Sequence, residues 1–239
     1  MSRSVATIAW ESTGAALMNS LRWLYGRLAS GKSETAPTTP HNVEDQIASL
    51  IRRSAGQAGV VGFGTGLGGM FTLPIALPAN IAGVAALQIH MVQEIARMRG
   101  YDLRSEQVES LTLVCLTGNA AVDVLKDVGI AVGRKLTQQA VGQISGAALL
   151  RINQAVGFRL VTKGGTSGIV NLGKAVPFVG GLVGGTIDGI STAAVGNAAK
   201  ALFPSVNGTE QARDEQDGVT YGAAQPEQKV LSPPDLTRS

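Results

Sequence analysis

The sequence has few of the side chains that build disulfides, metal sites or aromatic surfaces. Of its 239 residues, one is cysteine and two are histidine, and aromatic residues make up 4%. The single cysteine, Cys115, excludes an internal disulfide and a cysteine-based metal site, and a reducing compartment fits this usage. His41 and His90 form no pair at ligand spacing. We therefore expect no metal and no other cofactor.

Basic residues are too dispersed for a nucleic-acid surface. The formal net charge is +3, and the tail from Ser205 onward holds six acids against three bases, so the rest of the chain carries +6. Its dense basic pairs are Arg52/Arg53 and Arg134/Lys135, and no aromatic residues alternate with them. A mildly basic body instead suits an anionic membrane surface or a phosphate-bearing partner. We expect no nucleic-acid partner.

Residues 1–29 are predicted to form an amphipathic helix. Its apolar stripe recurs at steps of four and three residues and consists of Leu17, Leu21, Leu24 and Leu28. Three aromatic rings either pack on the body or sit at a membrane interface, namely Trp10, Trp23 and Tyr25. Charged residues interrupt the stretch, so it is not a convincing signal peptide. Residues 30–41 are polar with two prolines, which is typical of a linker.

Residues 54–93 contain no Lys, Arg, Asp or Glu. A membrane-spanning helix needs about 20 predominantly apolar residues. Residues 58–77 have that length, but glycines and threonines dilute their apolarity, and Pro74 and Pro78 are expected to break the run. The stretch therefore predicts a bent or re-entrant shape, or a buried soluble core, and both readings stay open.

The rest of the body, residues 42–204, also has helical spacing. Ser105 is predicted to cap a helix that Gly129 ends, and residues 131–163 continue the helical pattern. Residues 169–203 repeat the combination of a proline with a glycine-rich run. Alternation at period two is absent, so we predict an all-α fold with two glycine-rich apolar helical hairpins. The tail, residues 205–239, is predicted to be disordered.

The glycines allow two readings. The letters GTGLGG at residues 64–69 match a dinucleotide-binding fingerprint, but a strand before them and an uninterrupted helix after them are missing. Spaced four residues apart on helices, the glycines instead form grooves through which helices touch each other or the bilayer. The glycines predicted to do so are Gly62, Gly64, Gly66, Gly68, Gly69, Gly180, Gly181, Gly184 and Gly185.

Reactive side chains are sparse. Cys115 lies between apolar neighbours and is interpreted as a core residue, because no base near it in sequence lowers its pKa. Asp123 and Asp127 are one helical turn apart and are interpreted as a solvated face. Asp188 interrupts an apolar stretch and needs a partner, for which the candidates are Lys163, Lys174 and Arg159. No catalytic residue is predicted.

Three stretches resemble the bacterial EcsC family. They read GFGTGLGGMFTLPIALPANIAGVAALQIHMVQEIARMRGYDL, CLTGNAAVDVLKDVGI and INQAVGFRLVTKGGTSGIVNLGKAVPFVGGLVGGTIDGISTAAVGNAAKALF, in the family's order over residues 45 to 203. His90 stands where many relatives have arginine. The family's signature falls on Gly62, Gly66, Gly69, Thr72, Pro74, Pro78, Asn80, Tyr101, Asp102, Asn119, Asp123, Lys163, Asn171 and Asp188.

The resemblance implies a membrane-associated protein linked to ABC transport or to envelope and secretion processes. Expected partners are the lipid surface at the cytoplasmic face of the inner membrane, transporter subunits and a second copy of the chain. Bases flanking the first glycine-rich hairpin are expected to face phosphate headgroups, namely Arg52, Arg53, Arg97 and Arg99. We read the protein as non-enzymatic. The alternatives are a peptidase-like hydrolase, a label given to some relatives, and a soluble cytoplasmic module that binds a phosphate-bearing ligand through its glycines.

Overall fold

The fold is all-α, as predicted. The computed structural model describes residues 5–30, 43–67, 69–132, 136–171 and 179–204, and within these ranges it contains helices and no strand. The side chains of residues 5–13, 66–81 and 163–180 also lie outside the description. The elements are α1 (Val5–Ala29), α2 (Val43–Leu67), α3 (Gly69–Met98), α4 (Glu106–Cys115), the 3₁₀ helix η2 (Gly118–Ala120), α5 (Ala121–Asp127), α6 (Gln138–Gly142), α7 (Gly146–Asn171) and α8 (Val179–Leu202).

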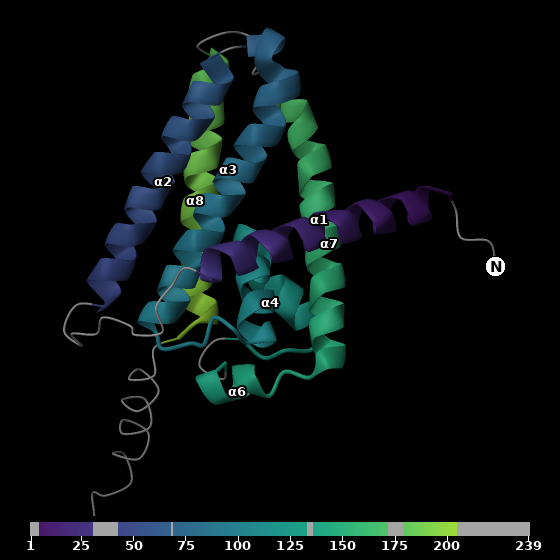
Figure 1. Cartoon of the computed structure of the whole chain (residues 1–239), viewed down its shortest axis with the longest axis vertical. Coiled ribbons are helices and arrows are strands. Elements are labelled where there is room, and N and C mark those ends of the chain that lie inside the picture. Colours follow the sequence, from purple (N-terminus) through teal and green to yellow (C-terminus); the bar gives the residue numbers. More distant parts are fainter. Residues whose placement is uncertain (1–4, 31–42, 68, 133–135, 172–178, 205–239) are drawn as a thin grey trace, which may run out of the picture.

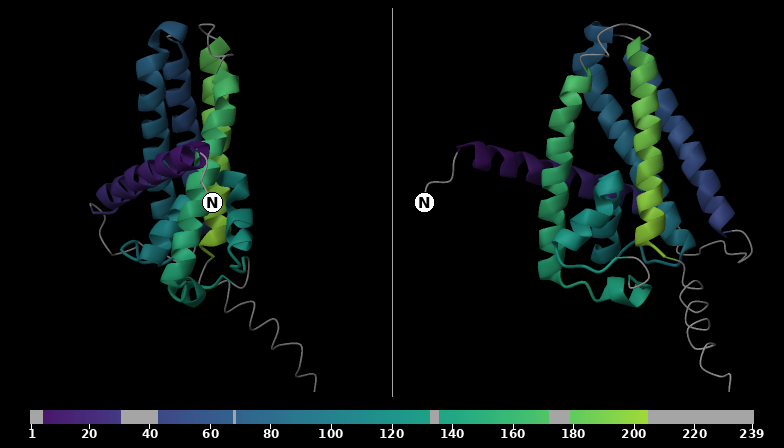
Figure 2. Two further views of the ribbon diagram at one scale, coloured as in Figure 1. Left: turned by 90° about the vertical axis from the view of Figure 1, so that its right-hand side faces the viewer. Right: turned by 180° about the vertical axis from the view of Figure 1, so that it is seen from behind.

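Four long helices converge at one end of the molecule (Figure 1). There α2 gives way to α3, and the end of α7 lies near the start of α8. We call this the hairpin end and define it as residues 54–67 of α2, 69–83 of α3, 160–171 of α7 and 179–190 of α8. At the opposite end, the base, α4 to α6 lie between and below the long helices, while α1 crosses them at a steep angle (Figure 2).

The buried core lies toward the base. Its side chains come mainly from the second half of α3 and from α4, with contributions from α1, α2, α5, α7 and α8, and the largest include Ile47, Ile89, Ile95, Leu111, Leu125, Ile152 and Phe203. The side chain of Ser105 caps α4 by accepting a hydrogen bond from the backbone N–H of Val108, as predicted. The core therefore holds the non-hairpin part of all four long helices together.

Helix α1 docks on this core through its second half. Met18, Leu21 and Tyr25 are buried, and the other leucines of the predicted stripe pack around them. The Tyr25 hydroxyl donates to the Leu103 carbonyl at 2.8 Å, and the Arg22 guanidinium pairs with Glu109 of α4 at 2.6 Å. The sequence left open whether three aromatic rings pack on the body or face a membrane. Tyr25 packs on the body and Trp23 is 68% exposed, whereas Trp10 lies outside the described side chains.

Three helix boundaries differ from the sequence prediction. Helix α3 runs through Pro74 and Pro78, which were expected to break it, because prolines bend a helix without ending it when the flanking hydrogen bonds persist. The single helix predicted up to Gly129 is divided into α4 and α5 by a turn in which Gly118 has a φ of 63°. The helical pattern predicted over residues 131–163 starts as the short α6, and α7 begins only at Gly146. Local spacing does not reveal these interruptions.

The predicted tail, residues 205–239, and most of the predicted linker, residues 30–41, lie outside the described residues.

The most extensive helix interface joins α2 to α8, which are distant in sequence. The two helices run antiparallel and approach so closely that a Cβ added to Gly185 would lie 2.6 Å from the carbonyl oxygen of Gly59. A Cβ at Gly62 would lie 2.9 Å from the carbonyl oxygen of Gly184 and would overlap the carboxylate of Asp188. Glycine costs a helix about 1 kcal/mol per residue relative to alanine. Close packing of the two backbones offsets that cost.

Helices α7 and α8 pack on different partners and scarcely on each other. Helix α7 packs against α1, α4 and α5, and a Cβ added to Gly14 of α1 would lie 3.8 Å from the backbone of Gly157 in α7. Helix α8 packs against α2, α3 and η2. The two helices diverge from the hairpin end toward the base (Figure 2). The second predicted hairpin is therefore open, and the close glycine contacts join the two hairpins to each other.

A buried arginine ties the base together. Arg99, which follows α3, is 8% exposed, and its guanidinium donates to the Phe203 carbonyl at 2.6 Å and pairs with Glu44 of α2. Lys200 of α8 approaches the second carboxylate oxygen of Glu44 at 3.3 Å. The ring of Phe203 meets Tyr101 edge-on, with centroids 5.0 Å apart. These contacts fix the register of α2, α3 and α8 at the base.

The glycine contact between α2 and α8 predicts opposite effects for two alanine substitutions. Gly185→Ala places a methyl group against a backbone carbonyl that cannot rotate away, so the free energy of unfolding should fall by about 1–3 kcal/mol. Gly64→Ala meets no atom within 4 Å and should raise the free energy by about 0.5–1 kcal/mol through helix propensity. Urea unfolding followed by circular dichroism measures both. Equal shifts in the same direction would contradict this account of the interface.

Candidate functional site

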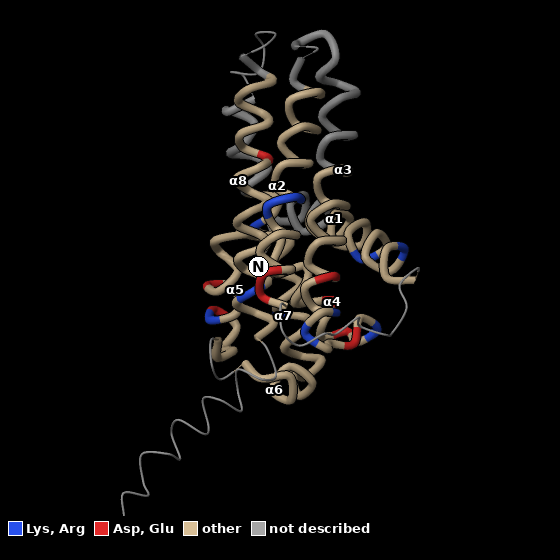
Figure 3. The backbone as a smooth tube through the Cα atoms, turned by 90° about the vertical axis from the view of Figure 1, so that its left-hand side faces the viewer, with Lys and Arg blue, Asp and Glu red and all other residues tan. Residues whose placement is uncertain are grey.

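The hairpin end is poor in charge. Its helical residues include one base and one acid, Lys163 and Asp188, among four helices. Figure 3 shows the acids and bases gathered toward the base, with one acid on α8 nearer the hairpin end. Lys163 and the nearby Lys174 lie outside the described side chains, while the carboxylate of Asp188 lies beside Gly62 in the α2–α8 interface. Charge is therefore segregated along the long axis of the helices.

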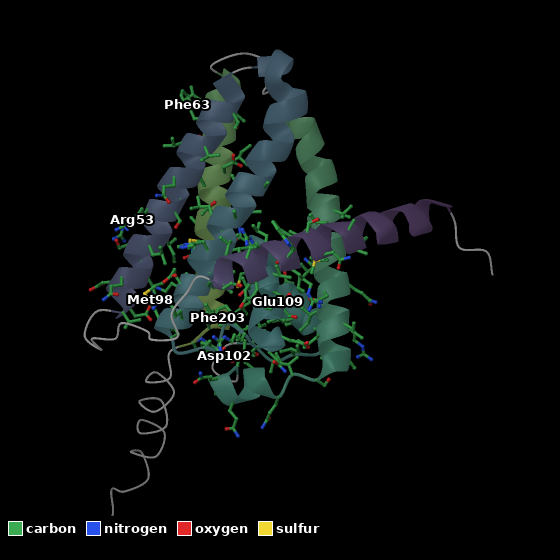
Figure 4. All side chains as sticks on the ribbon, viewed as in Figure 1. Arg53, Phe63, Met98, Asp102, Glu109 and Phe203 are labelled. Carbon is green, nitrogen blue, oxygen red and sulfur yellow. The ribbon has the colours of Figure 1, made fainter. Side chains whose placement is uncertain are left out.

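Large apolar side chains are exposed on the same end. Val60 of α2 is 73% exposed and Leu182 of α8 is 63% exposed, and Val61, Ile187 and Ile190 are also accessible to solvent. Phe63, near the upper end of α2 in Figure 4, packs against the backbone of Gly181. Exposed apolar side chains gathered at one end of a protein are typical of an interaction site. The hairpin end is thus the candidate contact surface.

The structure separates the four arginines predicted to face headgroups. Arg52 and Arg53 are exposed on α2, and Arg53 lies at about the height of α1 in Figure 4. Arg97 is partly buried and pairs with Glu94 at 2.7 Å. Arg99 is the buried cation of the base and cannot reach a headgroup, so this prediction is wrong for Arg99. Its place next to Arg97 at the end of α3 gave no sign of this burial.

The predicted contact glycines also fall into distinct groups. Gly62, Gly181, Gly184 and Gly185 lie in the α2–α8 interface, whereas Gly64 has no neighbouring atom within 4 Å of an added Cβ. Gly66, Gly68, Gly69 and Gly180 lie outside the described side chains. The sequence reasoning missed Gly59, Gly189 and Gly196, which also meet the partner helix. Gly59 precedes Gly62 by three residues and Gly189 follows Gly185 by four, so helical spacing could have indicated that they share the same helix faces.

A hollow of about 600 Å³ opens between α7, α8 and the turn before α5. Its polar lining consists of Thr117, Asn119, Arg159, Thr162 and Ser191, and its apolar lining consists of Ala120, Ile187, Ile190 and Ala194. Its volume lies in the range of small-molecule sites, which are mostly apolar with a few convergent polar groups. It exists because α7 and α8 pack on different partners. The sequence singled out Asn119 and Arg159 but gave no sign that they share a cavity.

Among the described side chains that line the hollow, Arg159 is the one cation. Arg159 donates from Nη2 to Asp127 of α5 at 2.8 Å, and both side chains are partly exposed. Arg159 was one of three partners predicted for Asp188, and the other two, Lys163 and Lys174, lie outside the described side chains. Asp127 was expected to belong to a solvated face together with Asp123, which is indeed exposed. The pair joins α5 to α7.

The potential nucleophile and bases are dispersed. Cys115 is completely buried in α4, and burial raises the pKa of its thiol well above the ordinary value. Burial likewise raises the pKa of Tyr101 to about 12, although the nearby Arg99 opposes the shift. His90 is exposed on α3, and Asp123 lies on α5. Cys115, His90 and Asp123 therefore lie on three different helices.

The other signature residues are scattered as well. Asp102 accepts a hydrogen bond from the backbone N–H of Arg104 at 2.9 Å, in the turn between α3 and α4. Four of the signature positions, Thr72, Pro74, Pro78 and Asn80, belong to α3, and Lys163 and Asn171 belong to α7, with side chains outside the description. Across the described ranges, no three His, Cys, Asp or Glu side chains are placed to hold a metal ion. No described helix is both long and apolar enough to cross a bilayer.

The helix arrangement and the charge distribution define a class: an all-α protein whose four long helices share a charge-poor, glycine-rich end. The model of the EcsC protein family matches residues 30–204 of the sequence. The chain belongs to the EcsC family. No curated protein and no solved structure matches the chain.

The burial of Cys115 makes a chemical prediction. Because the thiol is fully buried and its pKa is raised, the native protein should react with a thiol reagent such as Ellman's reagent only through unfolding. The observed rate should therefore rise with urea in step with the unfolding equilibrium. Rapid stoichiometric labelling of native protein at neutral pH would show an accessible thiolate and contradict the assignment of Cys115 to the core.

Proposed function

We propose that the protein is a non-enzymatic, membrane-associated accessory protein that contacts the bilayer through its hairpin end. The observation that supports this best is the coincidence of missing charge and exposed apolar side chains at one end of a long molecule. In the described part of the chain, the buried core and the ion pairs lie toward the base. Such segregation suits a protein with one end in an apolar medium.

The geometry is compatible with shallow insertion. From Gly157, where α1 crosses α7, to the end of α7 at Asn171 is fourteen residues, or about 21 Å of helix. From Arg53 to the end of α2 at Leu67 is the same number of residues. The hydrocarbon core of a bilayer is about 30 Å thick. With its start in the headgroup region, the hairpin end would therefore reach about the middle of the bilayer and stop short of the other side.

Helix α1 and the exposed bases would then lie at the membrane surface. Helix α1 crosses the long helices steeply, so it would run along the bilayer when they stand upright in it (Figure 1). Its exposed Trp23 and the nearby Arg27 suit the headgroup region, as do Arg52 and Arg53 of α2. We place the protein at the cytoplasmic face of the inner membrane. We propose subunits of an ABC transporter as its protein partners, following the resemblance to EcsC proteins.

Vesicle flotation tests the role of the hairpin end. The double variant V60D/L182D places two carboxylates on the exposed apolar surface and should weaken binding to phosphatidylglycerol-containing vesicles at least about tenfold, because burying one such side chain is worth about 1.5–3 kcal/mol. The matched control is L150D, since Leu150 is equally apolar and 66% exposed but lies in the first turns of α7 at the base. Equal loss of binding in both variants, or no binding by the unaltered protein, would reject the proposal.

A further inference from the structure

We propose that the hollow between α7 and α8 binds one acyl chain of an anionic lipid, with the headgroup at Arg159 and Asn119 and the chain directed toward the hairpin end. This inference deepens the proposed function and rests on it for the source of the lipid. The site is distinct from the general apolar surface, because it is a hollow of about 600 Å³ lined by both polar and apolar side chains.

The apolar wall continues beyond the hollow. Ile190 and Ile187 line it from α8, and Leu182 follows on the same helix nearer the hairpin end. All three are exposed, and residues 182 to 190 extend over about 12 Å of helix. On α7, the exposed Phe158 stands next to Arg159. Exposed apolar side chains on α8 therefore continue from the hollow toward the part of the molecule that we place in the bilayer, with Leu182 turned by roughly 80° around the helix from Ile190.

The polar lining places a negatively charged headgroup at one position. The hydroxyl groups already donate to backbone carbonyls: Thr117 to Val114, Thr162 to Phe158 and Ser191 to Asp188, at 2.7, 2.9 and 3.1 Å. These groups therefore offer mainly lone pairs, which do not attract an anion. In the described lining of the hollow, the donors left for an anion are the Asn119 amide and the Arg159 guanidinium.

Arg159 can hold an anion without breaking its ion pair. The contact with Asp127 uses Nη2, and the guanidinium carries further N–H donors on Nε and Nη1. A charge-assisted hydrogen bond from this planar group suits phosphate and carboxylate oxygens. Asp127 lowers the net charge of the site, so the apolar chain has to supply much of the affinity. A bare anion should therefore bind far more weakly than an amphiphile.

The depth of the site agrees with a membrane lipid. Arg159 is two residues beyond Gly157, the point at which α1 crosses α7, so it lies at the height that we assign to the headgroup region. A lipid bound there would keep its headgroup at the surface while its chain follows α8 into the leaflet. The space that α7 and α8 leave between them would then be filled by lipid.

A bilayer-free binding assay tests the site. Isothermal titration with decyl phosphate below its micelle-forming concentration should give saturable binding and a rise in the melting temperature. Decyltrimethylammonium, which has the same chain and the opposite charge, should bind at least about tenfold more weakly. Inorganic phosphate alone should produce no measurable binding. Equal binding of both amphiphiles, or binding of phosphate as tight as that of decyl phosphate, would overturn the proposal.

Two substitutions of the same ion pair separate binding from structure. R159Q and D127N both remove the 2.8 Å pair, but only R159Q removes the cation. R159Q should weaken decyl phosphate binding about tenfold or more, whereas D127N should leave it unchanged or tighter. A194F, which fills the hollow, should abolish binding of the chain. Equal losses in R159Q and D127N would show a merely structural role and overturn the assignment.

The outcomes distinguish this inference from the proposed function. Because the decyl phosphate assay contains no bilayer, failed flotation with intact, R159Q-sensitive binding would reject membrane contact by the hairpin end and leave the amphiphile site standing. Intact flotation with no decyl phosphate binding would reject the lipid site alone. R159Q should keep most of its affinity for vesicles, since Val60 and Leu182 are unchanged.

Discussion

The close approach of α2 and α8 is the constraint on which the rest of the structure depends. Two helices can bring their backbones together only where neither carries a side chain, and here Gly59, Gly62 and Gly185 provide that space. The contact fixes α8 to the first helix pair, with the buried cation Arg99 holding the same helices at the base. Helix α7 is left to pack on α1 and α4. The hollow between α7 and α8 follows from this division.

The same constraint explains why the charge-poor end needs so few large side chains. Interfaces built from glycine have little apolar volume to bury, so stability must come from the core near the base, where Ile95, Leu111 and Phe203 are fully buried. The hairpin end is then free to present valine, leucine and isoleucine outward. The buried core and the exposed apolar side chains of the hairpin end thereby lie at opposite ends of the same helices.

Much of the local structure could be predicted from the sequence, and most of the long-range structure could not. Helical spacing and capping are local properties, so the all-α fold and the Ser105 cap were accessible. Periodicity also indicates which glycines share a helix face, but not which helix meets that face. The buried position of Arg99 depends on a carbonyl 104 residues away, and the shared cavity of Asn119 and Arg159 depends on how α7 and α8 diverge. Such properties arise only when distant segments pack.

The pairing of α2 with α8 also has a consequence for synthesis of the chain. Helix α2 is made early, whereas the helix that covers its glycine face begins at Val179. At a translation rate of roughly 5–20 residues per second, the ribosome needs on the order of ten seconds to add the intervening residues. Throughout that interval the nascent chain displays uncovered backbone and an uncharged stretch of forty residues. A chaperone or an early membrane encounter would protect this intermediate from aggregation.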